Sequence, residues 1–246
     1  MKPALMLLAA TAMFATSACN AEKSGTTSNT ASNAPIKPVA PPKGGDWTKM
    51  VTQTPEGGFL MGNPQADVKL IEYGSMTCPH CAEFAEKDAP QLIDKFVKSG
   101  RVSFEYRNFV RDGMDVAMSL VARCGGTERF FPLTDALFKS QRELFDRAQQ
   151  APAAQQQELS QSPAGYGQLA GLPQWAAQRG LPSAKTNACL ADQAQSDKLV
   201  QMRSEADSNF QIPGTPTFVL NGKVVETENS PLLPQLENKL REALGS

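Results

Sequence analysis

Two cysteines separated by two residues, Cys78 and Cys81, lie where a strand pattern changes to a helix pattern, and this junction constrains the fold most. The apolar segment 68–73 that precedes them is typical of a buried strand. Pro79 suits the first position of a helix, because its fixed φ is already close to the helical value. We therefore expect Cys78 at the N-terminal end of a helix and Cys81 one turn further along.

Strand patterns occur on both sides of a long helical segment. Segment 58–61 is expected to form a short edge strand, and alternating apolar residues predict another strand over 102–106. Between them, Pro90 should kink or break the helix. Apolar residues recur at helical spacing over 114–209, and the Asn-Gly turn within 217–226 predicts a hairpin.

The expected fold class is therefore α/β, with an all-helical domain inserted at 114–209. The flanking segments 57–113 and 210–246 would together form the sheet-containing domain. A final helix carries leucines on one face, and we expect Ser230, next to Pro231, to cap it.

The N-terminus has the features of a targeting segment. Lys2 is followed by an apolar stretch that is too short to span a bilayer, which predicts a signal peptide over residues 1–18. Cleavage after Ala18 would release the chain, whereas acylation of Cys19 would anchor it to a membrane. Five cysteines leave one unpaired after two pairs, which favours acylation of Cys19. Both alternatives place the protein outside the cytoplasm, with residues 19–56 as a flexible linker.

Composition excludes several functions. The chain of 246 residues has 24 Lys plus Arg and 25 Asp plus Glu, which argues against nucleic-acid binding. A single histidine excludes a His-rich metal site, and zinc would need four ligands, although Cys124 and Cys189 each stand alone. We expect neither a metal nor another cofactor.

The position of the cysteine pair predicts redox chemistry. The unpaired N–H groups and the positive dipole end of the helix would stabilise a Cys78 thiolate and lower its pKa. Cys81, one turn along, would be shielded and act as the resolving thiol. His80 is the only histidine, and as an imidazolium beside Cys78 it would favour the thiolate further.

Two features outside the cysteine motif also attract attention. Glu72 interrupts the apolar strand; if buried, its carboxyl should have a raised pKa and exchange protons, but it could equally face solvent from an edge strand. Thr215-Pro216 precedes the predicted hairpin, and Gly214 before it suggests a tight turn with a cis peptide bond.

Taken together, these features resemble the DsbA family of thiol:disulfide oxidoreductases, whose thioredoxin-like fold has an inserted helical domain. Residues 78–81, Cys-Pro-His-Cys, match the active-site tetrad of the family. Glu72 stands where the family has a buried acid, and segment 214–218 resembles its cis-proline loop. The resemblance covers roughly residues 57–244 and implies catalytic roles for Cys78, Pro79, His80, Cys81, Glu72, Thr215 and Pro216.

The resemblance also implies an activity and partners. Such a protein would donate the Cys78–Cys81 disulfide to reduced or unfolded extracytoplasmic proteins, and a membrane partner would reoxidise it. No dimerisation domain is visible, so we expect a monomer. Cys124 and Cys189 resemble an extra disulfide of bacterial members.

Three alternatives stay open. Thr215 stands where the best-known oxidases have Val and occurs in isomerase relatives, so an isomerase or a reductase of the same fold is possible. A redox-inert, chaperone-like binding module is the third alternative.

Overall fold

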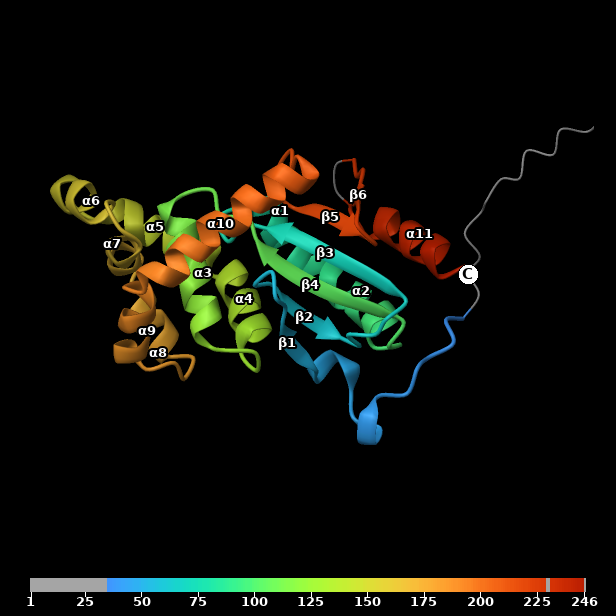
Figure 1. The fold of residues 1–246 in the computed structure, drawn as a ribbon. Helices are drawn as coiled ribbons and strands as arrows, with labels where there is room; N and C mark the ends of the chain where they lie inside the picture. The colour runs from blue at the N-terminus through green and yellow to red at the C-terminus, as the bar shows by residue number, and fades with distance from the viewer. Residues whose placement is uncertain (1–34, 229–230, 246) are drawn as a thin grey trace, which may run out of the picture. The chain divides into compact units, whose positions relative to one another are not determined.

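A six-stranded mixed sheet forms the centre of the protein (Figure 1). The computed structural model describes residues 35–228 and 231–245, so the expected signal peptide over 1–18 and Cys19 lie outside the described residues. The strand order is β1-β2-β4-β3-β5-β6, in which β3 and β4 are parallel and the other pairs antiparallel. The strands are β1 (Val51–Gln53), β2 (Phe59–Gly62), β3 (Val68–Gly74), β4 (Val102–Asn108), β5 (Thr217–Leu220) and β6 (Lys223–Val225).

Strand β3 lies inside the sheet, between β4 and β5. Alternate side chains of β3 point to opposite faces, so Leu70 and Glu72 share one face while Tyr73 points to the other. Both faces are covered by helices. Tyr73 packs with Ala206 and Phe210 of α10 (Gln193–Phe210), and Leu70 belongs to the main core on the opposite face.

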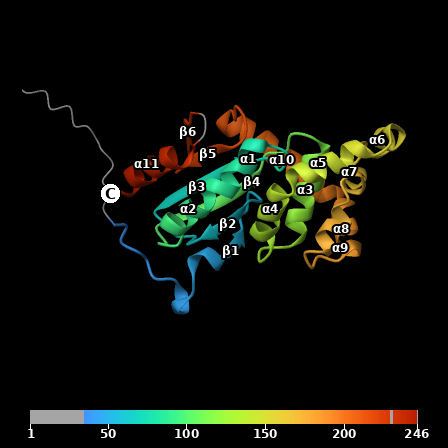
Figure 2. The same ribbon diagram turned by 180° about the vertical axis from the view of Figure 1, so that it is seen from behind.

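The helical segment that follows Cys78 lies on the Leu70 face of the sheet, where Figure 2 shows α1 and α2 in front of β3 and β4. It begins as α1 (Pro79–Glu83) and continues through α2 (Ala89–Leu92), with π-helical turns at Phe84–Asp88 and Ile93–Val97 on either side of α2. Pro90 therefore does not end the helix. Lacking an N–H, it is accommodated by wider turns on both sides of it.

The segment between β4 and β5 is helical over almost the range that its sequence predicts. Its first helix begins at Gly113 and its last ends at Phe210, within one residue of the predicted limits. It does not form a core of its own. Phe130 stacks on Phe59 of β2 at 3.8 Å between ring centroids, and both belong to one hydrophobic cluster that includes the sheet. The helices are α3 (Gly113–Cys124), α4 (Phe130–Lys139), α5 (Gln141–Gln150), α6 (Ala153–Leu159), α7 (Pro163–Leu169), α8 (Leu172–Ala177), α9 (Ser183–Leu190) and α10.

The structure corrects the expected linker. Residues 19–56 are not all linker, because short 3₁₀ turns at Pro42–Gly44 and Trp47–Lys49 lead into strand β1. Trp47 is buried, its Nε1 donates to the Val39 carbonyl at 2.8 Å, and the Val39 N–H donates to Ser99 at 2.8 Å. Consequently β2, expected at an edge, has a neighbour on each side. One buried indole in a polar segment was the overlooked signal.

The last helix, α11 (Leu233–Leu244), is capped from a distant part of the chain. Ser230 lies outside the described residues, and Leu232 occupies the cap position. The Asp88 carboxylate accepts hydrogen bonds from the N–H groups of Leu232 and Leu233 at 3.2 and 3.3 Å. A long-range contact thus joins α11 to the helix after Cys78, and the cap by Ser230 stays a prediction.

No helix within the described part of the chain is long and apolar enough to cross a membrane. Residues 35–228 and 231–245 also contain no cluster of three or more His, Cys, Asp or Glu side chains arranged to hold a metal ion.

Candidate active site

Cys78 lies at the start of α1, directly after the short loop that follows β3. It occupies the N-cap position, with extended backbone (φ −89°, ψ 121°), and Pro79 is the first helical residue. Cys78 and Cys81 are free thiols, with 3% and 0% of their surface exposed. The Cys78 sulfur therefore lies at the N-terminus of α1, and the Cys81 sulfur lies one helical turn further along.

Hydrogen bonds stabilise the thiolate of Cys78. They lower its pKa from an ordinary value of 9.0 to about 5, with the Cys81 thiol as the largest cause, although burial opposes the shift. The side chain of Thr215 and the backbone N–H groups of Cys81 and His80 act in the same direction. When protonated, the Cys78 thiol donates to the Thr215 carbonyl oxygen at 3.0 Å. Cys78 is thus the acidic thiol of the pair.

Cys81 has the opposite character. Burial raises its pKa well above 9.0, and interactions with Cys78 and Glu72 raise it further. The Ser75 N–H, 3.5 Å from Cys81 Sγ, partly offsets this effect. At neutral pH the reduced pair therefore holds one negative charge on Cys78 and one proton on Cys81.

Glu72 is buried at the centre of the sheet, which decides between the two alternatives that its sequence left open. It pairs in register with Tyr106 on β4 and Phe218 on β5, and only 3% of its surface is exposed. Oε1 has no hydrogen-bond partner among the described residues. Burial raises the pKa of Glu72 well above 4.5, and Cys78 raises it further. Glu72 is consequently a buried acid electrostatically coupled to both cysteines.

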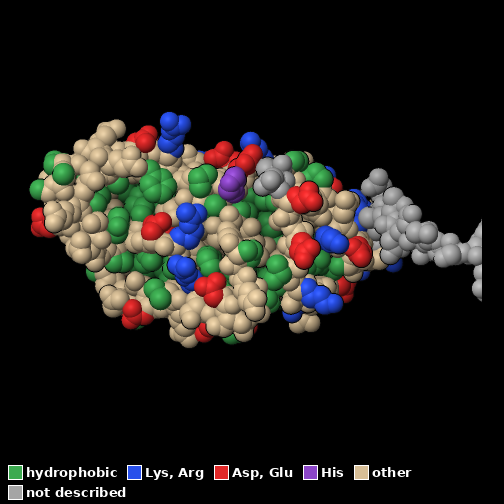
Figure 3. Space-filling view, turned by 90° about the horizontal axis from the view of Figure 1, so that it is seen from above, with side chains coloured by type: hydrophobic (Ala, Val, Ile, Leu, Met, Phe, Trp, Pro, Cys, Tyr) green, Lys and Arg blue, Asp and Glu red, His purple; other side chains and the backbone are tan. Residues whose placement is uncertain are grey.

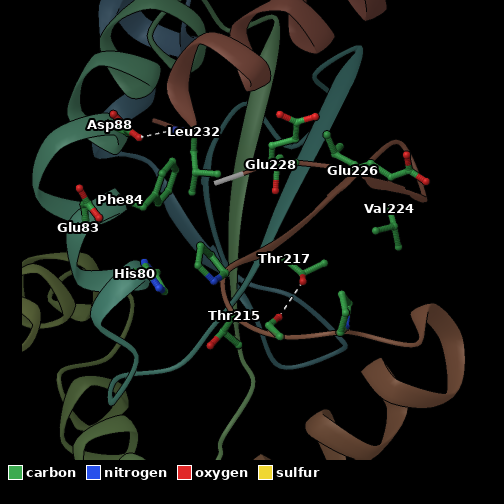
Figure 4. A pocket seen from close by; sticks show the side chains of 15 residues that line it. His80, Glu83, Phe84, Asp88, Thr215, Thr217, Val224, Glu226, Glu228 and Leu232 are labelled. Carbon is green, nitrogen blue, oxygen red and sulfur yellow. Dashed lines mark hydrogen bonds between the residues drawn. The ribbon is translucent and has the colours of Figure 1, made fainter. Parts of the chain in front are cut away.

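The loop that faces Cys78 contains a cis peptide bond between Thr215 and Pro216. Thr217 Oγ1 donates to the Gly214 carbonyl at 2.7 Å and closes the turn (Figure 4). The Thr215 hydroxyl is buried and has no hydrogen-bond partner among the described residues, and the Thr215 side chain lowers the pKa of Cys78. This loop brings a backbone carbonyl and a hydroxyl to the redox sulfur.

A groove of about 840 Å³ runs from His80 along this loop. Its apolar surface includes Phe84, Pro216 and Val224, and Val224 is 38% exposed. The exposed carboxylates of Glu226 and Glu228 line the groove on the β6 side (Figure 4). The view onto this surface in Figure 3 shows the purple histidine with acidic side chains near it.

Pro79 and His80 are exposed, whereas Cys78 is buried. The His80 side chain lines the groove, and the contribution of this residue to the Cys78 thiolate comes from its backbone N–H. The backbone N–H of His80 thus stabilises the thiolate, and the expected effect of a His80 imidazolium stays a prediction.

Cys124 and Cys189 form a disulfide that joins α3 to α9. They are 65 residues apart in sequence and 5.9 Å apart between Cα atoms. This bond links helices of the inserted segment, apart from the Cys78–Cys81 pair.

Sequence reasoning missed several polar residues that hold the loop before Cys78. Asp115 of α3 has 0% of its surface exposed and accepts from Met76 N–H at 2.9 Å and from Ser75 Oγ. Gln141 of α5 is buried and donates to the Cys78 carbonyl at 3.1 Å. An acidic residue between the apolar Met114 and Val116 was a usable signal for Asp115, whereas nothing in the sequence pattern singles out Gln141.

Comparison with known proteins places this site in a family. The model of the family described as Thioredoxin matches residues 54–233. A protein of Rickettsia bellii (strain RML369-C), named as a protein-disulfide oxidoreductase, is 27% identical over 186 residues, which cover 74% of this chain and 62% of that protein. Disulfide bond formation protein D of Bacillus subtilis (strain 168) is 24% identical, over 70% of this chain and 71% of its own. The chain thus spans about three-fifths of the length of the Rickettsia relative.

Solved structures agree with this assignment. A protein-disulfide isomerase from Novosphingobium aromaticivorans superimposes with a TM-score of 0.68 and is 30% identical, covering 74% of this chain and 96% of its own. The alpha-DsbA1 of Wolbachia pipientis has a TM-score of 0.59 at 23% identity, over 76% and 90% of the two chains, and so shares the fold.

Proposed function

The chain belongs to the thioredoxin family, and from this premise we propose that it is a thiol:disulfide oxidoreductase of DsbA type that oxidises reduced substrate proteins. The observation that supports this most strongly is the asymmetry of the pair: the pKa of Cys78 is lowered to about 5, while that of Cys81 is raised above 9.0. A redox pair needs this division between a leaving thiolate and a protonated resolving thiol.

The oxidised enzyme would react in two exchanges. A substrate thiolate attacks Cys78 Sγ, the Cys78–Cys81 bond breaks, and Cys81 leaves as a thiolate that takes up a proton. The second substrate thiolate then attacks the substrate sulfur of the mixed disulfide, and Cys78 leaves as a thiolate. Two electrons pass from the substrate dithiol to the enzyme, and the substrate keeps the new disulfide.

Glu72 would move the proton that Cys81 gains and loses. Its carboxyl is buried, its Oε1 is unpaired among the described residues, and its charge acts on Cys81. A carboxyl with a raised pKa can hold a proton at neutral pH and release it to a neighbouring thiolate. Thr215 and Pro216 would present the substrate to Cys78, with an extended segment of the substrate lying in the groove beside them.

The direction of catalysis follows from the charge. Hydrogen bonds to Cys78 stabilise a thiolate that exists only in the reduced enzyme, so they make the disulfide more oxidising. Equilibration with a glutathione series tests this inference: we expect a potential at least about 100 mV above the ≈ −270 mV of thioredoxin. A thioredoxin-like potential would favour a reductase, and efficient unscrambling of a mispaired substrate would favour an isomerase.

Turnover of a reduced dithiol peptide tests the activity itself. Oxidised protein should form one peptide disulfide per Cys78–Cys81 bond consumed, and Cys78→Ser should form none. Failure of the unmodified protein to oxidise the peptide would contradict the proposed oxidase, and the glutathione potential would then separate a reductase from the chaperone-like, redox-inert alternative.

We further propose that the protein acts outside the cytoplasm as a monomer anchored through acylated Cys19, with a membrane partner that reoxidises it. The targeting pattern over residues 1–18 supports the location, and the single cysteine left after two pairs supports the anchor. Intact mass after membrane extraction should show Cys19 as a lipid-modified N-terminus. An unmodified chain in the soluble extracytoplasmic fraction would contradict the anchor.

A further inference from the structure

The backbone of Met76, two residues before Cys78, is held at its N–H and at its carbonyl by the inserted helical segment. Its N–H donates to Asp115 Oδ1 at 2.9 Å, and its carbonyl accepts from Gln141 Nε2 at 2.8 Å. Asp115 lies in the first turn of α3, and Gln141 is the first residue of α5. We call Asp115, Met76 and Gln141 the Met76 clamp.

The clamp extends to Cys78 through Gln141. Gln141 Nε2 also donates to the Cys78 carbonyl at 3.1 Å. That carbonyl accepts the Ala82 N–H at 3.1 Å, which is the first hydrogen bond of α1. Gln141 thus holds the carbonyl at which the helix begins, and it fixes the direction in which the first N–H groups of α1 point.

The clamp extends to Cys81 through Asp115. Ser75 Oγ donates to Asp115 Oδ2, and the Ser75 N–H lies 3.5 Å from Cys81 Sγ. Cys81 is therefore connected through Ser75 to α3, and Cys78 is bonded directly by Gln141 of α5.

Asp115 is fully buried, and burying its carboxyl group costs free energy. Burial raises its pKa to about 7 even though Ser75, Met76 and Arg111 donate hydrogen bonds that lower it. A buried carboxylate is costly unless its oxygens are hydrogen-bonded. Here several donors meet it, and two come from the loop that carries Cys78.

We propose that Asp115 and Gln141 are positioning residues of the redox pair, through which the inserted helical segment sets how oxidising the pair is. They fix the backbone of Met76 and the Cys78 carbonyl, so that the N–H groups of His80 and Cys81 face Cys78 Sγ. Since the thiolate exists only in the reduced protein, loosening the clamp costs the reduced form more than the oxidised form. The inference rests on the proposed function.

The test uses Gln141→Leu, which removes both donated hydrogen bonds, in the full chain with Cys19→Ser. Gln150→Leu, an exposed residue of the same helix, is the matched control. Thiolate absorbance against pH gives the Cys78 titration midpoint, and alkylation of the Cys78 peptide in glutathione buffers gives the equilibrium constant.

We expect Gln141→Leu to raise the midpoint by about half a pH unit and to shift the glutathione equilibrium about threefold toward the protein disulfide, the effect of one ordinary hydrogen bond. Gln150→Leu should leave both unchanged. If the oxidised form of Gln141→Leu loses stability in urea while both redox readouts stay at their unmodified values, Gln141 is only structural and the proposal is wrong. Gln141→Asn, which keeps an amide but is too short for both carbonyls, should act in the same direction if Gln141→Leu does not fold.

A double-mutant cycle tests the shared action of the two residues. If Asp115→Asn and Gln141→Leu both act through the backbone of Met76, their effects on the glutathione equilibrium will not be additive. Additive effects would overturn the clamp. These readouts need no protein substrate, so a failure of peptide oxidation by the unmodified protein would count against the proposed function and not against the clamp.

Discussion

Acidification should destabilise the reduced protein relative to the oxidised protein, because only the reduced form contains the Cys78 thiolate. The pKa of this thiol is lowered from 9.0 to about 5 in the folded protein. A lowered pKa contributes stability that is complete above the unfolded value and is lost as pH falls through the folded value.

The magnitude follows from the two pH units between neutrality and the folded pKa. At 1.36 kcal/mol for each unit, the thiolate contributes about 2–3 kcal/mol to the free energy of unfolding at pH 7. Almost none of this should remain at pH 4. Cys78 is 3% exposed, so solvent screening reduces the effect little.

Urea unfolding of both redox forms at a series of pH values measures the difference. Cys19, Cys124 and Cys189 are replaced by serine, so that Cys78–Cys81 is the only pair that can be reduced. Because Glu72 and Asp115 are present in both forms, subtracting the two unfolding free energies removes most of their contribution. Cys78→Ser has no oxidised form, and its loss of stability between pH 7 and pH 4 should be smaller than that of the reduced protein by the thiolate contribution.

The reasoning would be refuted by a reduced-minus-oxidised difference that stays flat between pH 7 and pH 4. A reduced form that gains stability on acidification would contradict it equally.

Three further outcomes are expected. Thr215→Val keeps the shape of the side chain but removes the hydroxyl that stabilises the Cys78 thiolate. Thiolate absorbance should therefore show a Cys78 titration midpoint about half a pH unit to one unit higher. An unchanged midpoint would count against this stabilisation by the hydroxyl. Glu72→Gln removes a buried carboxyl with a raised pKa, and ionisation of this carboxyl lowers the stability of the unmodified protein as pH rises above about 4.5. Urea unfolding should therefore find the variant about 1–3 kcal/mol more stable than the unmodified protein at pH 8 but not at pH 4, and its peptide oxidation should be slower. A variant as stable as the unmodified protein at both pH values would contradict this. Peptides with Lys beside the reactive cysteine should be oxidised faster than peptides with Glu there, because Glu226 and Glu228 line the groove. This preference should weaken at high salt and in the double variant Glu226→Gln, Glu228→Gln. If neither high salt nor the double variant changes the preference, these two carboxylates are not its cause.

Local patterns in the sequence determined the fold class. The apolar segment at β3, the helical spacing over 114–209 and the Asn221-Gly222 hairpin are short-range signals, since each is written within one element. The junction at Cys78 is of the same kind, because Pro79 and the free N–H groups of a helix start depend only on neighbouring residues.

Tertiary structure decided what depended on distant segments. Glu72 could face solvent or core until β4 and β5 enclosed it on both sides, since alternation alone does not say which strand is at an edge. Part of the expected linker is ordered because Trp47 is buried and bonds Val39, whose N–H donates to Ser99. The first N–H groups of α11 donate to Asp88, which is far away in the sequence. Gln141 reaches Cys78 across 63 residues of chain, and no local pattern specifies such a hydrogen bond, because only the packing of α5 against the loop brings the two groups together.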